Sequence, residues 1–203
     1  MIGGHVSTQI NVRIWLDPVC PFSWNTARWL DAVAPQAGAR IDWQLMNLAV
    51  LNEGRELPQE QHARLRDSQQ IGRLMAGVQR DLGQPGLHAA YFTFGRLYFD
   101  ESLPVGTELA DGVLAAVAPL RTTSESLSDT SLDAAVRSSH EAGQRALGDV
   151  GGSPLLQVRG RTFFGPVLTA VPVQDSARQL FDAVVGLAGV PEFAQLQRPR
   201  AAH

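Results

Sequence analysis

Cys20 is the only cysteine among the 203 residues of the chain, and it stands directly before Pro21. Residues 12–16 are β-branched, aromatic or otherwise mostly apolar, which is typical of a buried strand. Proline has no N–H and its φ already suits a helix, so Pro21 predicts the first turn of a helix after that strand. The unpaired N–H groups and the dipole of a helix N-terminus favour a thiolate over a thiol. We therefore expect a reactive sulfur whose pKa lies below the ordinary ~8.5.

Ser23 is the next side chain that could take part in this chemistry, three residues after Cys20. Its hydroxyl either donates to the Cys20 thiolate or bonds the backbone of the first helical turn, and the spacing alone leaves both open. A free cysteine is often only a small buried hydrophobic residue, but the position before Pro21 favours the reactive interpretation. Because the chain has no second cysteine, an adduct on Cys20 must be resolved by an external thiol.

The elements that position these residues begin with two strands. Residues 40–45 alternate polar and apolar side chains, as a half-buried strand does. The helix between the two strands favours a parallel β-α-β unit with a right-handed crossover. Farther along the chain, residues 154–158 and 162–164 predict a hairpin, and residues 175–187 predict a final helix.

Between residues 58 and 148 the sequence shows helical periodicity and no strand signal. Four amphipathic patterns follow one another in this segment. Gly83 closes the first of them, while Thr107 and Ser131 are candidate N-caps of the third and the fourth. We therefore expect an all-helical segment inserted between two β-containing segments.

The composition argues against several other classes of function. The formal net charge of -3 and the lack of a basic run argue against a nucleic-acid surface. No apolar run reaches membrane-spanning length, and residues 1–5 lack the features of a signal peptide, so we expect a cytoplasmic protein outside the membrane. The five histidines have no metal-ligand spacing, and a single cysteine cannot form a thiolate zinc cluster. No Gly-x-Gly-x-x-Gly follows a strand, so neither a bound flavin nor a nicotinamide is predicted.

The order of strand, Cys-Pro helix, strand, helical segment, hairpin and helix resembles the thioredoxin fold of the disulfide-bond protein A (DsbA) family. Residues 20–23 (Cys-Pro-Phe-Ser) stand where that family keeps its Cys-Pro-x-Cys redox motif. Residues 151–154 (Gly-Gly-Ser-Pro) match the family's cis-proline loop, which implies a cis bond between Ser153 and Pro154 and a contact between Ser153 and Cys20.

More narrowly, the chain is similar to the actinobacterial mycothiol-dependent nitroreductases and reductases within that family. The matching stretches are 17–18 (DP), 48–53 (LAVLNE), 139–143 (SHEAG) and 163–168 (FFGPVL). The resemblance implies a thiol-disulfide oxidoreductase with a low-molecular-weight thiol, mycothiol or glutathione, as co-substrate. Its other substrate would be a small molecule or a disulfide.

The resemblance also implies the architecture and the site. The fold would be an α/β, thioredoxin-like fold of the DsbA type, with residues 1–57 and 149–203 as the thioredoxin-like domain. From the four amphipathic patterns we expect residues 58–148 to be an inserted all-helical subdomain that forms a lid beside the active site. The implied site consists of the catalytic residues Cys20 and Ser23 and of a thiol-binding set, namely Pro21, Phe22, Trp24, Asn52, Ser153 and Pro154.

Two positions depart from the family pattern, since Ser23 replaces the second cysteine and Phe22 replaces a tryptophan. Ser23 thereby removes the resolving thiol of the ordinary dithiol cycle. The kappa-class glutathione transferases carry Ser-Pro-x-Ser-Trp at this place, so one alternative is a transferase or isomerase in which Ser23 stabilises the thiolate of a bound cofactor. Another is a non-catalytic binding protein on a thioredoxin scaffold. His140, at the edge of an apolar helix face, is interpreted as a satisfied surface or boundary residue.

Overall fold

The structure is a computed structural model that describes residues 9–199. Residues 1–5, on which the prediction of a missing signal peptide rests, lie outside the described residues. Within residues 9–199 no helix is both long enough and apolar enough to cross a membrane.

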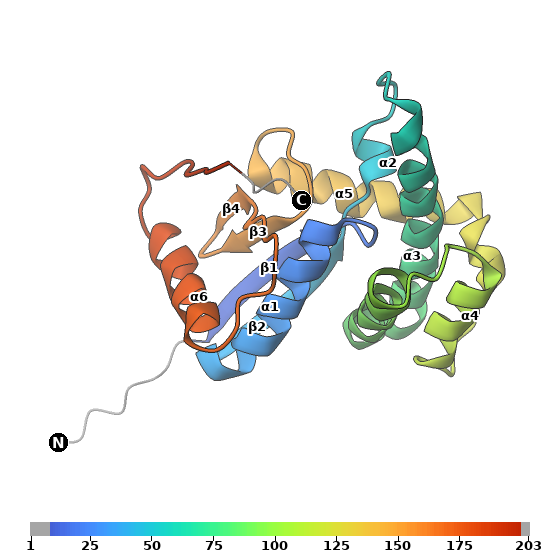
Figure 1. Cartoon of the computed structure of the whole chain (residues 1–203), viewed down its shortest axis with the longest axis horizontal. Coiled ribbons are helices and arrows are strands. Elements are labelled where there is room, and N and C mark those ends of the chain that lie inside the picture. Colours follow the sequence, from blue (N-terminus) through green and yellow to red (C-terminus); the bar gives the residue numbers. More distant parts are fainter. Residues whose placement is uncertain (1–8, 200–203) are drawn as a thin grey trace.

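Four strands form one sheet in the order β2-β1-β3-β4 (Figure 1). They are β1 (Ile10–Leu16), β2 (Ala39–Leu45), β3 (Leu155–Val158) and β4 (Arg161–Phe164). β1 and β2 are parallel, and β3 runs antiparallel to both β1 and β4, so the predicted β-α-β unit and hairpin are confirmed. Because Leu155 pairs with Trp15, the residues just before β3 lie beside the end of β1, where Cys20 follows.

Helices α1 (Pro21–Ala37) and α6 (Asp175–Leu187) pack together on one face of the sheet (Figure 1). Helix α1 begins as predicted, with Cys20 as its N-cap and Pro21 as its first residue. It ends at Gly38, whose φ of 62° is left-handed and suits glycine. The indole N–H of Trp29 donates to the carbonyl oxygen of Ala177 over 2.9 Å and joins the two helices. The range predicted for the last helix is confirmed.

Helix α5 (Asp133–Leu147) packs against the opposite face of the sheet. Side chains alternate along a strand, so Trp15 points away from the face that its neighbours on β1 present to α1. Gly143 lets α5 approach this ring closely, because a Cβ atom there would lie 3.0 Å from the Trp15 side chain. The hydroxyl of Ser139 donates to the carbonyl oxygen of Leu45 over 2.7 Å and fixes α5 to β2.

The regular elements between β2 and β3 are all helical, as predicted. They are α2 (Leu48–Leu51), α3 (Gln59–Gly95), a π-helical turn (Arg96–Asp100), α4 (Thr107–Ala115), two 3-10 turns (Ser124–Leu127 and Thr130–Leu132) and α5. Gly83 breaks α3 at the predicted position, with a φ of 65°. The next residue, Gln84, donates to and accepts from the backbone of Trp43, so this break lets α3 cover the free edge of β2.

Two predicted helix caps are wrong. Thr107 is the first residue of α4, and Gly106 is the N-cap, without a side-chain hydrogen bond. Ser131 lies inside the 3-10 turn before α5, and Asp129 caps that turn by accepting the Ser131 N–H over 3.0 Å. This turn leads directly into α5, whose N-cap is Leu132 and has no side-chain hydrogen bond.

One apolar core runs through the sheet, α1 and the helical segment. Trp24 of α1 connects the two parts, since its ring centroid lies 6.2 Å from that of Tyr91 and 5.6 Å from that of Phe92, both on α3. Gly95 leaves room for this ring, because a Cβ atom there would lie 2.4 Å from it. The fold class is confirmed as α/β with a helical insertion, while the division of the chain into two domains stays a prediction.

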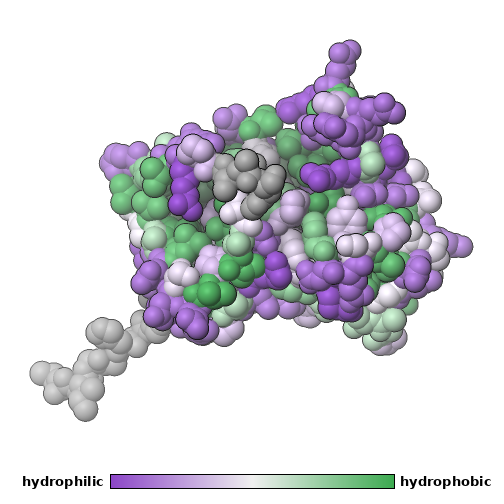
Figure 2. Space-filling model, viewed as in Figure 1, coloured by the Kyte–Doolittle hydropathy of each residue, from purple (hydrophilic) through white to green (hydrophobic). Residues whose placement is uncertain are grey.

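The surface shows no single apolar face in the view of Figure 2, where hydrophobic residues are scattered among hydrophilic ones. Six large hydrophobic side chains of the described residues are exposed: Val150, Phe164, Val173, Leu187, Val190 and Leu196. They come from the loop before β3, the end of β4, the last residue of α6 and the segments on both sides of that helix. Exposed hydrophobic residues of this kind are common on proteins and by themselves indicate no partner.

Candidate active site

Cys20 lies where the end of β1, the start of α1 and the loop before β3 meet. Its side chain is buried, and its Sγ donates to the carbonyl oxygen of Ser153 over 3.5 Å. Its backbone N–H donates to the carbonyl oxygen of Asp17 over 3.2 Å. The bond between Ser153 and Pro154 is cis, and the contact between Ser153 and Cys20 that the resemblance implied is present.

Ser23 is fully buried, and its Oγ lies 2.6 Å from the Oγ of Ser153. The Ser153 Oγ also accepts the backbone N–H of Asp17 over 2.8 Å. When Ser153 donates its single proton to Ser23, the proton of Ser23 is free to point at the Cys20 sulfur. The structure therefore brings Cys20, Ser23 and Ser153 together, and the role of Ser23 toward a thiolate stays a prediction.

Burial raises the pKa of the Cys20 thiol above its ordinary value, so the prediction of a lowered pKa is wrong. Hydrogen bonds from the Ser23 hydroxyl and from the backbone N–H groups of Ser23 and Phe22 pull the pKa down. The negative charge of Asp17 adds to the rise in pKa. Loss of water around a buried thiolate therefore outweighs the helix N-terminus. In its resting form the residue is a thiol, in agreement with the bond that Sγ donates to Ser153.

Asp17 is the important residue of this site that the sequence analysis missed. Its carboxylate is fully buried, and its Oδ1 accepts the backbone N–H of Val19 over 2.8 Å. Its Oδ2 accepts the N–H of Leu48 over 2.6 Å and the hydroxyl of Ser68 over 2.5 Å. Asp17 thus ties the loop that carries Cys20 to α2 and α3. An acidic residue at the end of a buried strand, three positions before the cysteine, was the signal that could have found it.

Burial raises the pKa of Asp17 to about 6, although its hydrogen bonds from Ser68, Leu48 and Val19 all lower it. The group therefore titrates close to neutral pH rather than near the ~3.9 of an exposed aspartate. A buried acid with such a pKa beside a cysteine is typical of a functional site.

Pro21, Phe22 and Trp24 flank Cys20 along the first turns of α1. Pro21 and Phe22 are partly buried, and the Phe22 carbonyl accepts the Thr26 hydroxyl over 2.9 Å. Trp24 is buried, and the guanidinium carbon of Arg28 lies 4.9 Å from the centre of its ring. These residues supply apolar surface next to the sulfur, and their predicted contribution to thiol binding stays a prediction.

Asn52 and His140 make no hydrogen bond to Cys20, Ser23 or Ser153 among those of the described residues. Asn52 is the C-cap of α2, and its amide donates back to the carbonyl oxygen of Leu48 over 2.8 Å. Its predicted contact with a small thiol is not tested by this geometry. His140 is buried rather than at the surface, and its Nδ1 accepts the N–H of Asn47 over 3.4 Å. The interpretation of His140 as satisfied is confirmed, and its placement at the surface is wrong.

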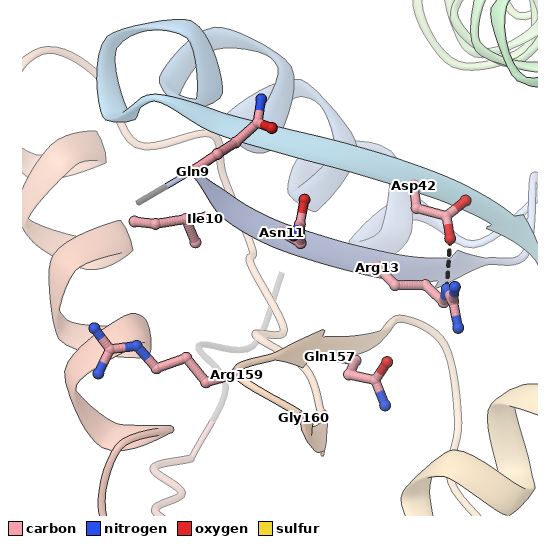
Figure 3. Close-up of a pocket in the computed structure, with 8 residues that line it drawn as sticks. All are labelled: Gln9, Ile10, Asn11, Arg13, Asp42, Gln157, Arg159 and Gly160. Carbon is pink, nitrogen blue, oxygen red and sulfur yellow. Dashed lines mark hydrogen bonds and ion pairs between the residues drawn. The ribbon is translucent and has the colours of Figure 1, made fainter. Parts of the chain in front are cut away.

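A depression of about 450 Å³ lies at the opposite end of β1 (Figure 3). Its lining residues come from the first half of β1 and the residue before it, from β2, from β3 and from the turn of the hairpin: Gln9, Ile10, Asn11, Arg13, Asp42, Gln157, Arg159 and Gly160. Figure 3 shows Arg13 reaching across to Asp42, and the two form an ion pair of 2.5 Å. Cys20 does not line this depression, which belongs to the other end of the sheet.

No group of three or more histidine, cysteine, aspartate or glutamate side chains within residues 9–199 is arranged to hold a metal ion. The absence of a bound metal, flavin or nicotinamide stays a prediction. The chemistry available at the site is that of one sulfur, three serine hydroxyl groups and one buried carboxyl group.

Comparison with known proteins places the chain among thiol-dependent enzymes. Residues 19–198 match a family described as mycothiol-dependent nitroreductase Rv2466c, or Rv2466c-like. An uncharacterized protein of Mycobacterium tuberculosis, Rv2286c, is 30% identical over 197 residues, which cover 94% of this chain and 82% of that protein. The family match extends over the strand-to-helix turn, the helical segment and the cis-proline loop.

Solved structures share the fold. A thiol-disulfide oxidoreductase of Corynebacterium diphtheriae, MdbA, has a TM-score of 0.54 at 12% identity and covers 87% of this chain and 83% of its own. A 2-hydroxychromene-2-carboxylate isomerase has a TM-score of 0.55 at 14% identity and covers 88% and 95%. At these identities the likeness concerns the fold alone, and it confirms the predicted thioredoxin-like fold of the DsbA type.

Proposed function

The chain belongs to the Rv2466c-like family of mycothiol-dependent nitroreductases, and on this basis we propose that it is a thiol-dependent oxidoreductase with a one-cysteine cycle at Cys20. The observation that supports the proposal most directly is the set of groups around the Cys20 sulfur. Cys20 is held against the cis-proline loop, and the position one helical turn later holds the hydroxyl of Ser23 instead of a second thiol. A sulfur in this position can form a mixed disulfide, but the chain cannot resolve it.

In the first step the Cys20 thiolate attacks a disulfide between mycothiol and a second thiol. A bond forms between the Cys20 sulfur and the mycothiol sulfur, while the old sulfur–sulfur bond breaks. The electron pair leaves with the second thiol, which takes up a proton and is the reduced product. The enzyme is then a mixed disulfide with mycothiol.

In the second step a free mycothiol thiolate attacks the mycothiol sulfur of this adduct. Mycothiol disulfide forms, and the electron pair of the broken bond returns to Cys20. The net reaction reduces one mixed disulfide and oxidises one mycothiol, so electrons balance without a bound cofactor. A small thiol stays reduced in the cytoplasm, which is the location we propose for the reaction.

We assign the roles around the sulfur as follows. Ser23 donates a hydrogen bond to the thiolate, the Ser153 carbonyl oxygen accepts the proton of the thiol, and Pro154 presents the backbone of Ser153 to the incoming sulfur. Pro21, Phe22 and Trp24 shape the apolar surface along the adduct. Asn52 is assigned to binding of the small thiol. This set depends on the geometry of the cluster and on the family resemblance together.

Reduction of a nitro compound is a second candidate, because the description of the family names a nitroreductase. Two-electron reduction of a nitro group to a nitroso group consumes two thiols and releases one water. With a single cysteine, the two thiols are Cys20 and one mycothiol, which end as a mixed disulfide on the enzyme. A second mycothiol then restores Cys20, as in the disulfide cycle.

Turnover of a mycothiol mixed disulfide by the wild type and by Cys20→Ser tests the proposal. We expect the variant to lose activity by a factor on the order of 10³ or more, because the nucleophile is absent. The matched control is Ser176→Ala, which changes an exposed residue of α6. Full activity of Cys20→Ser would favour the kappa-type alternative, and no activity of the wild type toward any thiol substrate would favour the binding protein.

A further inference from the structure

Tyr91 of α3 is a buried tyrosine whose hydroxyl has no partner. Its side chain is packed in the core, with ring centroids 6.2 Å from Trp24 and 5.9 Å from Phe92. Its hydroxyl is buried and makes no hydrogen bond to any of the described residues. Phenylalanine would fill the same space without leaving a polar atom unpaired. The hydroxyl of Tyr91 is therefore a donor whose acceptor is absent while Cys20 is a thiol.

Tyr91 is linked to the active site through Trp24, whose backbone N–H donates to the carbonyl oxygen of Cys20 over 3.0 Å. The pKa of Tyr91 is raised well above its ordinary value, first by burial and then by the negative charges of Cys20 and Asp17. The hydroxyl thus lies within electrostatic reach of the sulfur and of the buried carboxylate. Trp24 adds a second buried donor without a partner, its indole N–H, and the guanidinium of Arg28 lies over its ring.

Of the two acids, the sulfur is the one that loses a contact when it ionises, although the Ser23 hydroxyl and the N–H groups of Ser23 and Phe22 already stabilise its anionic form. The Asp17 carboxylate already accepts hydrogen bonds from Val19, Leu48 and Ser68. The Cys20 thiol donates its proton to the carbonyl oxygen of Ser153. When the sulfur ionises, that proton is gone and the two electron-rich atoms repel each other. The thiolate can then turn about the Cα–Cβ bond toward a free donor.

We propose that the Tyr91 hydroxyl is a hydrogen-bond donor reserved for the anionic Cys20 sulfur. The inference rests on the proposed function and adds a residue of the helical insertion to the site. It acts twice in the cycle, when the thiolate forms and when Cys20 is the leaving group. In the second case the bond between Cys20 and the small thiol breaks, the electron pair moves to the Cys20 sulfur, and Tyr91 stabilises that charge without giving up its proton.

The test is the rate of alkylation of Cys20 by iodoacetamide as a function of pH, measured on the full chain. In Tyr91→Phe we expect the midpoint to move upward and the rate at neutral pH to fall roughly three- to tenfold. The unfolding transition should stay where it is or move upward, since an unpaired hydroxyl is removed. The matched control is Tyr98→Phe, which removes a hydroxyl that donates to Asp67 over 3.1 Å. It should leave the alkylation profile unchanged.

An unchanged midpoint in Tyr91→Phe would overturn the inference, and the proposed function would stand as long as the wild type forms its adduct. No adduct in the wild type would instead overturn the proposed function. A second measurement tests the inference even if Tyr91→Phe does not fold. The chain has two tyrosines, so Tyr98→Phe leaves Tyr91 alone. Its ultraviolet difference spectrum should shift to longer wavelength as Cys20 ionises, and the shift should vanish when Cys20→Ser is added. A flat spectrum would contradict the inference.

Discussion

Strand β1 carries an ion pair that water reaches at its middle residue, and a carboxylate that water does not reach follows its end. At the middle of the strand, Arg13 pairs with Asp42 beside the open depression, with side chains 49% and 35% exposed. Beyond its end, Asp17 is buried and is held by two backbone N–H groups and one hydroxyl. The charge of Asp42 is screened by solvent and neutralised by Arg13, whereas the carboxylate of Asp17 is bound only by uncharged donors.

This difference shows where the sheet can do chemistry. At the open end a charge changes little about its surroundings, because solvent and the opposite charge compensate it. At the closed end each ionisation alters its neighbours, as the effect of Asp17 on the pKa of Cys20 shows. Helices α2, α3 and α5 together with the cis-proline loop create this closed end. The candidate site is thus a product of burial as much as of the Cys-Pro turn.

A second thiol at the closed end should have the largest effect. In Ser23→Cys the new sulfur lies one helical turn from Cys20, within the usual range of a disulfide. We expect the variant to release a small thiol from the Cys20 adduct without any added thiol, on the order of a hundredfold or more faster than the wild type. Mass measurements after single turnover would follow the release. Ser176→Cys, which adds a thiol on exposed α6, should retain its adduct.

Replacing Asp17 and replacing Asp42, each in a separate variant, should lower the free energy of unfolding by different amounts. Asp17→Ala leaves the Ser68 hydroxyl and the N–H groups of Leu48 and Val19 buried without an acceptor, so we expect a loss of about 3 to 5 kcal/mol in the free energy of unfolding. Asp42→Ala breaks only an exposed pair and should cost less than about 1 kcal/mol. Urea denaturation at neutral pH gives both values. Equal losses would contradict the contrast between the two ends.

The pH dependence of stability should carry the signature of Asp17. Its folded pKa of about 6 lies above the unfolded value of 3.8, so the folded state holds the proton more tightly. The resulting stability is fully present below pH 3.8 and is lost as the pH rises through about 6, a change of about 3 kcal/mol. We expect the difference in unfolding free energy between the wild type and Asp17→Asn to follow this curve. A difference that does not vary between pH 4 and 7 would rule out the raised pKa.

Glycine substitutions should show how tightly the closed end is covered. In Gly143→Ala a Cβ atom meets the buried Trp15 side chain at 3.0 Å, so we expect a loss of about 1 to 3 kcal/mol from overpacking. Gly186 of α6 has nothing within 4 Å of a Cβ atom. Gly186→Ala should therefore stabilise the protein by about 0.5 to 1 kcal/mol. Thermal and urea unfolding should show opposite changes in stability for the two variants. An increase in the stability of Gly143→Ala would contradict the close approach of α5 to the sheet.

The sequence predicted those features that depend on local chemistry. The Cys-Pro turn, the break at Gly83, the hairpin and the last helix follow from residues that stand next to one another. The contact between Ser153 and Cys20 joins distant residues, and the family resemblance alone pointed to it. These local patterns and the resemblance were enough to predict the fold class and the position of the Cys20 sulfur at the start of a helix.

What the sequence did not predict depends on tertiary burial. The pKa of Cys20 is shifted upward, whereas the prediction was a downward shift, because burial removes water from the sulfur. The role of Asp17 was hidden because its partner Ser68 comes 51 residues later, in a helix whose docking no local pattern reveals. The caps at Thr107 and Ser131 failed because Gly106 is the N-cap of α4 and because a 3-10 turn, capped by Asp129, leads directly into α5.

The most direct test of the one-cysteine cycle is the intact mass of the wild type after exposure to mycothiol disulfide. The account predicts an increase by one mycothiol, located on Cys20, that persists after the disulfide is removed. Addition of mycothiol should then restore the original mass, and Cys20→Ser should gain no mass at any stage. A wild type that gains no mass, or that loses the added mycothiol with no thiol present, would contradict the account.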